Sequence, residues 1–104
     1  MTSIPKNQIK LAMNDDLSEN SFEIARVWIT NGGGSHVWIA AWALDGARSF
    51  GHLMADTVRH GAKAYATTYG LDEEETLQEI VNGLGEELLE QFNSLETVQE
   101  GGLN

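Results

Sequence analysis

Three residues spaced by four, His52, Asp56 and His60, form the sharpest constellation of side chains that could do chemistry. Side chains four positions apart are neighbours on a helix, so Asp56 could share a metal ion or a proton with either histidine. The two histidines are separated by roughly 12 Å of helical rise and cannot ligate one ion together. A metal site would therefore need a further ligand from elsewhere, such as His36 or Glu23.

A simpler interpretation is that these residues belong to the water-facing stripe of an amphipathic helix. Asp56 could then pair with Arg59 or His60, and surface pairs of this kind contribute little to stability. We therefore assign no catalytic residue, no metal ligand and no cofactor-binding residue from the spacing.

Other familiar binding and catalytic patterns also have simpler interpretations. The glycine run 32–34 joins two predicted strands, whereas a phosphate loop joins a strand to a helix. Neither Ser35 nor Ser49 lies in a Gly-x-Ser-x-Gly elbow. The acidic run 72–75 lacks the alternating ligands of a calcium loop and is better placed to complement a helix dipole. The chain has no cysteine, which excludes disulfides and thiolate zinc sites.

Charge is distributed unevenly along the chain. It carries 16 Asp+Glu and 6 Lys+Arg, for a formal net charge of −10. Residues 1–71 hold six of each sign, whereas the last 33 residues hold ten acids and no base. Because nucleic-acid binding needs a basic footprint that releases counterions, we expect no nucleic-acid partner.

Hydropathy argues against a membrane partner. The longest unbroken apolar stretch runs from Val37 to Leu44, far short of the ~20 residues that span a bilayer. The first ten residues lack the apolar run of a signal peptide. An acidic surface helix would be repelled by anionic lipid. We expect a cytoplasmic protein without membrane contacts.

Two segments rich in β-branched and aromatic residues, 22–30 and 35–43, flank a glycine-rich turn and predict a β-hairpin. A two-residue turn would set Trp28 against Val37 and split the three tryptophans between the faces. A three-residue loop would set Trp28 against Trp38, and Trp42 would share their face. These tryptophans could line a ligand pocket, although burial in a core or subunit interface is the commoner role.

Helical periodicity predicts two amphipathic helices after the hairpin. The first begins near residue 47 or 49 and ends at Tyr69, where Gly70 supplies a left-handed stop. Asp72 opens an Asp-x-x-Glu variant of the capping box, and the second helix runs from 72 to about 93. The connection is so short that the helices should pack antiparallel.

Glycines inside these predicted helices need an explanation, because each lowers helix stability by about 1 kcal/mol relative to alanine. Gly61 lies near the centre of the first helix's apolar face, and Gly85 lies at the edge of the second's. We expect a close approach of another element at both positions.

Together these patterns predict an α+β fold of order ββαα, a β-hairpin followed by two antiparallel amphipathic helices. We expect a single domain at 22–93, preceded by a polar arm at 1–21 and followed by a frayed acidic tail at 94–104. Apolar residues alternate at 8–13, which is compatible with a short N-terminal edge strand.

Three stretches follow a pattern found in a known family: ARVWI at 25–29, HV at 36–37, and Ala-Asp-x-x-Arg-His-x-Ala-x-Ala-Tyr at 55–65. Over about 25–66 the chain resembles a group of small bacterial proteins, domain of unknown function 5076. It departs from the pattern at 44–50, where the family usually carries Asp-Pro and a tryptophan. The resemblance implies a compact α+β fold and no activity. It also brings forward a candidate functional cluster: Asp56, Arg59, His60 and Tyr65.

The hairpin also bears on oligomeric state. Both of its faces are largely apolar, and a two-stranded sheet is marginally stable alone. Pairing of two chains through a face or a strand edge would bury this surface, so we expect a homodimer.

For function, we expect a non-enzymatic interaction or regulatory module rather than an enzyme. Its second helix would present an acidic face to a basic protein partner. That face comprises Glu79, Glu86, Glu87 and Glu90. The alternative is a small-ligand or metal-binding protein, or a minor enzyme, that uses the Asp56, Arg59 and His60 group.

Overall fold

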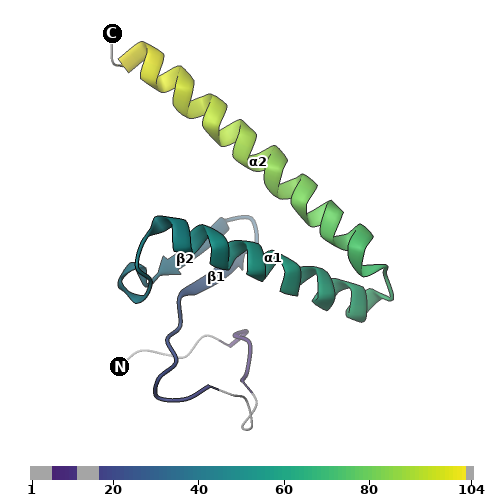
Figure 1. Ribbon diagram of the computed structural model, residues 1–104. Helices are drawn as coiled ribbons and strands as arrows, with labels where there is room; N and C mark the ends of the chain where they lie inside the picture. Colours follow the sequence, from purple (N-terminus) through teal and green to yellow (C-terminus); the bar gives the residue numbers. More distant parts are fainter. Residues whose placement is uncertain (1–5, 12–16, 103–104) are drawn as a thin grey trace. The chain divides into compact units, whose positions relative to one another are not determined.

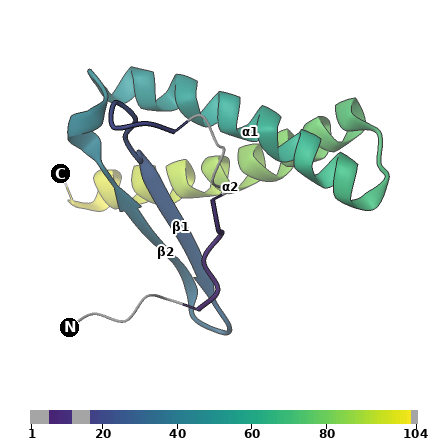
Figure 2. The same cartoon turned by 90° about the horizontal axis from the view of Figure 1, so that it is seen from below.

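The computed structural model of the protein describes residues 6–11 and 17–102 (Figures 1 and 2). Its elements follow in the predicted ββαα order, which confirms the α+β fold class. They are, in chain order, β1 (Ala25–Thr30), β2 (Gly34–Ile39), a one-turn 3-10 helix (Ala41–Ala43), α1 (Ala47–Tyr69) and α2 (Glu73–Gly102).

The chain divides into two compact units, Met1–Leu44 and Asp45–Asn104. The first contains the hairpin and the second contains both helices.

In the hairpin unit, β1 and β2 pair in antiparallel fashion around the three-residue loop 31–33 (Figure 2). The Gly33 amide donates a hydrogen bond of 2.8 Å to the Thr30 carbonyl, which closes the turn. Gly32 and Gly34 have φ angles of 73° and 79°, a region that side chains rarely adopt. The glycine run is therefore required by the turn.

Both pairings considered from the sequence are wrong, because the loop begins one residue earlier than either assumed. Trp28 lies opposite His36, and Arg26 lies opposite Trp38. The structure nevertheless has the three-residue loop length that places Trp28 and Trp38 on one face. Residues with even numbers on both strands share that face, since side chains alternate along a strand.

Flanking segments of this unit differ from the sequence expectations. Within the expected edge strand at 8–13, residues 8–11 form no strand, and 12–13 lie outside the described residues. β2 ends at Ile39 rather than continuing to 43, because the chain turns into the 3-10 helix there.

The ends of the two helices follow the predicted local signals. Gly70 adopts the left-handed conformation (φ 66°, ψ 40°) after α1, and its amide donates to the Ala66 carbonyl. Asp72 caps α2, since its Oδ2 accepts a 2.9 Å hydrogen bond from the Glu75 amide. The Thr76 hydroxyl adds a 2.7 Å hydrogen bond to the Asp72 carbonyl.

The helices pack together near their connection. Ala62 of α1 and Thr76 of α2 are the buried residues among the described side chains. A Cβ added at Gly61 would lie 3.7 Å from Ile80 Cδ1, so Gly61 lies against α2 as predicted. A Cβ at Gly85 would meet nothing within 4 Å, so the expected close approach there is not observed.

Beyond the connection the helices run back in opposite senses and diverge (Figure 1). This leaves the apolar side of α2 uncovered by α1 at four positions: Val81, Leu84, Leu88 and Phe92. α2 also continues to Gly102, past the expected end near residue 93, and so includes most of the segment expected to form a tail. No described helix is long and apolar enough to cross a membrane.

The cap at Asp72 provides a test of this unit. Asp72→Ala removes the acceptor of the Glu75 amide, so the free energy of unfolding should fall by about 1 kcal/mol. Asp72→Asn keeps an acceptor and should retain most of that stability. Urea unfolding at one fixed protein concentration measures both variants. Equal stability of Asp72→Ala and the unmodified chain would contradict the assignment.

Candidate functional site

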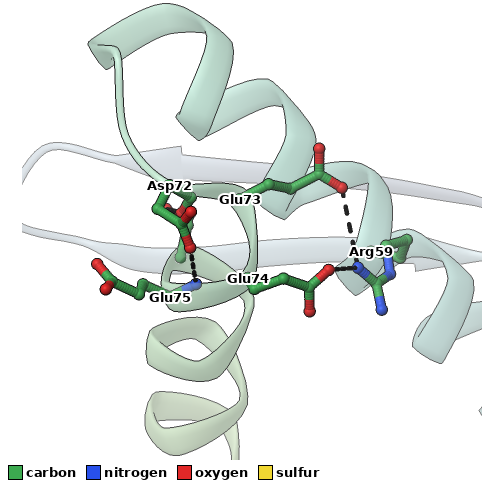
Figure 3. A network of polar contacts seen from close by, with 6 residues as sticks. Arg59, Asp72, Glu73, Glu74 and Glu75 are labelled. Atoms are coloured by element: carbon green, nitrogen blue, oxygen red, sulfur yellow. Dashed lines mark hydrogen bonds and ion pairs between the residues drawn. The ribbon is translucent and has the colours of Figure 1, made fainter.

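Arg59, one of the four residues in the predicted cluster, reaches from α1 to the start of α2 (Figure 3). Its Nη1 lies 3.0 Å from Glu74 Oε1 and 3.8 Å from Glu73 Oε2. These side chains are about two fifths to three quarters exposed, so each ion pair contributes little to the free energy of unfolding. Arg59 thereby links the two helices where the acidic run begins.

Asp56 and His60 form a separate pair on α1. His60 Nε2 lies 3.4 Å from Asp56 Oδ2, and both side chains are largely exposed. The contact is an ion pair only when His60 is protonated. Within 6–11 and 17–102, the structure brings together no group of three His, Cys, Asp or Glu residues that could hold a metal ion.

Tyr65 lies on the opposite side of α1 from Asp56, as a spacing of nine residues requires. Its ring stacks on Tyr69 with centroids 6.2 Å apart. It also lines a largely apolar hollow of about 510 Å³ between the helices, together with Gly61 and Ile80. The four residues of the predicted cluster therefore lie at three separate places.

The tryptophans do come together. All three line an open groove of about 760 Å³ on the hairpin, which Glu23, Arg26 and His36 also line. Trp28 is partly buried, whereas Trp38 and Trp42 are 61% and 74% exposed. The ring of Phe22 meets Trp42 edge-on, with centroids 5.4 Å apart. We call this surface the tryptophan groove.

Polar groups lie beside the indoles in this groove. Arg26 binds Glu23 through two hydrogen bonds, Nη2 to Oε1 at 2.6 Å and Nε to Oε2 at 3.2 Å. Arg26 is also the cross-strand neighbour of Trp38, and His36 is that of Trp28. Sequence reasoning missed this combination because it depends on the hairpin register. For a three-residue loop, the spacing of the aromatic residues predicted a shared tryptophan face, but not the polar residues beside it.

The candidate acidic face lies on α2. Glu79, Glu86 and Glu90 occupy one stripe of the helix, by their spacing of four and seven, and none pairs with a basic side chain in the described residues. Glu87 lies beside this stripe and accepts a 3.2 Å hydrogen bond from Gln91. Glu79 also lines the hollow between the helices.

These features define a small α+β protein with an aromatic groove and an acidic helix. The chain belongs to the family described as Domain of unknown function (DUF5076), whose family model matches residues 10–91. This match confirms the resemblance found in the sequence and extends it to both units.

A solved structure is also similar to this chain. It is described as "a putative pyruvate dehydrogenase from the photosynthetic bacterium Rhodopseudomonas palustrus CGA009". The two chains are 29% identical, with a TM-score of 0.60, and the similarity covers 84% of this chain and 86% of that one. No curated protein matches the chain.

The role of Arg59 as a link between helices can be tested by a double-mutant cycle. Arg59→Ala and Glu74→Ala should each lower the free energy of unfolding by up to about 1 kcal/mol, with a coupling of about 0.2–1 kcal/mol that shrinks with added salt. Asp56→Ala, on the exposed side of the same helix, should change stability by less than about 0.5 kcal/mol. Strict additivity of the Arg59 and Glu74 effects would refute the link.

Proposed function

We propose that the protein is a homodimeric, non-enzymatic interaction module that presents the acidic stripe of α2 to a basic protein partner. The carrying observation is the amount of apolar surface that the hairpin exposes. Large apolar side chains are exposed on both of its faces, with Ile29 at 83% on one and Trp42 at 74% among the groove residues. Soluble monomers rarely leave such patches uncovered.

The composition of the two hairpin faces supports an interface. The odd-numbered residues Val27, Ile29, Val37 and Ile39 form one aliphatic face. The other face combines tryptophan with arginine, the residue types that are enriched at protein interfaces. A two-stranded sheet with this composition requires another surface against it.

The acidic stripe supports a basic partner. Glu86 and Glu90 are four residues apart on α2, as are Glu75 and Glu79. Like charges at this spacing destabilise a helix by roughly 0.2–0.5 kcal/mol per pair. A basic partner would turn this repulsion into attraction, and long-range steering would speed the association.

The alternative function, binding of a small ligand or metal by Asp56, Arg59 and His60, has less support. Arg59 is engaged with Glu74, and the Asp56 and His60 pair lies on an open surface. The dehydrogenase description belongs to the solved neighbour, and the described residues here offer no arrangement from which that chemistry can be derived. The lack of cysteine is compatible with a reducing cytoplasm, where we propose that the module acts.

The proposed assembly predicts a mass. Sedimentation equilibrium of the full chain should give twice the 11.4 kDa of one chain, with reversible dissociation on dilution. A single-chain mass at every accessible concentration would contradict the homodimer.

The acidic stripe predicts charge-dependent binding. An oligolysine peptide should bind the full chain, and its affinity should fall steeply with added salt. Glu86→Gln with Glu90→Gln should weaken this binding several-fold by removing one charged pair from the stripe. A control with the same net charge, Glu19→Gln with Asp56→Asn, should bind nearly as well as the unmodified chain. Equal losses in the two double variants would show that only net charge matters, and the proposed partner face would fail.

A further inference from the structure

We infer that the tryptophan groove is the surface through which two copies of this chain associate, with the groove of one copy against the groove of the other. This inference rests on the proposed homodimer and adds to it the location of the interface. Three observations carry it: the exposed aromatic area, the charge of the groove, and the charge of the competing apolar surface on α2.

The exposed aromatic area is large enough to matter. Trp38, Trp42 and Phe22 are 61%, 74% and 60% exposed. Because such side chains bury 150–250 Å² each, these three leave about 300–500 Å² open per copy. Two copies would bury about 600–1,000 Å² through them alone, at least half of the ~1,200 Å² at the lower end for stable interfaces. Trp28 and the strand backbone around it supply further area.

The charge of the groove suits a second copy. Glu23 and Arg26 are the charged residues of 22–44, and they bind each other at 2.6 Å, so this part of the chain sums to zero. A strongly basic or acidic partner would gain no net attraction here. In a contact with two-fold symmetry the same patch of each copy meets the other. The Glu23 and Arg26 pair of one copy would then face the same pair of the other copy in the opposite orientation.

One competing surface is the uncovered apolar side of α2, represented by Leu84, Leu88 and Phe92. Packed helices lie about 8–10 Å apart, a distance comparable to the Debye length of about 8 Å at physiological salt, so repulsion between them is only partly screened. Each α2 carries nine acids and no base, so two of them in contact would repel strongly. For a chain of net charge −10, self-association is least opposed through its neutral hairpin.

The openness of the groove also favours a protein surface over a small molecule. Small-ligand sites are concave and bury most of the ligand. Here Trp42 is about three quarters exposed, so a small molecule would remain largely in water. The aromatic surface of a second copy would cover all three indoles at once.

The first test uses the unmodified chain, whose three tryptophans all line the groove. On dilution, the tryptophan emission should shift to longer wavelength, and acrylamide should quench it more strongly. The protein concentration at the midpoint of this change should equal the midpoint of dissociation measured by sedimentation. If the dimer dissociates without any change in emission, the interface lies elsewhere and the inference fails while the homodimer stands. If the chain is monomeric at all concentrations, the homodimer itself fails.

The second test compares two variants with matched exposure and the same charge change. Trp38→Glu should raise the dimer dissociation constant about 100-fold or more, since it places two carboxylates at the centre of the contact. Trp38→Phe should restore most of the affinity. Phe92→Glu, at a 59% exposed site on the uncovered apolar side of α2, should leave the dimer intact. Circular dichroism verifies that each variant is folded. Dissociation by Phe92→Glu together with an intact Trp38→Glu dimer would assign the interface to α2 and overturn the inference.

Discussion

A two-stranded sheet cannot bury either of its faces by itself, and this constraint governs the hairpin unit. The ladder hydrogen bonds and the glycine turn fix which side chains share a face, but they cover none of them. Trp38 and Ile29 therefore remain exposed on opposite faces, although both are residues that usually favour burial. A surface that covered these faces would contribute the hydrophobic free energy that the hairpin lacks, and this would link stability to the proposed assembly.

The helical unit depends on local interactions near its connection. The Asp72 cap, the left-handed Gly70 and the contact of Gly61 with Ile80 all lie within the first turns around the loop. Arg59 adds a link to the acidic run at the start of α2. Beyond this region α2 diverges, so its distal part carries an apolar side and an acidic side that α1 does not cover (Figure 1). The start of α2 therefore holds the contacts that stabilise the helix pair, and its distal part carries the exposed apolar and acidic side chains.

The sequence predicted those features that local chemistry determines. The order ββαα, the stop at Gly70 and the cap at Asp72 follow from residues close in the chain, and all were found. The hairpin register was missed because the position of the loop within four permissive residues changes every cross-strand pair. The groove partners of the tryptophans were missed with it. The link from Arg59 to Glu74 spans fifteen residues and depends on helix packing, which periodicity alone does not give.

We propose that a second copy covers the hairpin, and amide hydrogen exchange tests this most directly. Protection of the backbone amides in β1 and β2 is predicted to rise with protein concentration, because association suppresses opening of the hairpin. Amides around Ala62, in the buried part of α1, should change much less over the same range. Hairpin protection that is independent of concentration, across a range in which the mass doubles, would contradict the account.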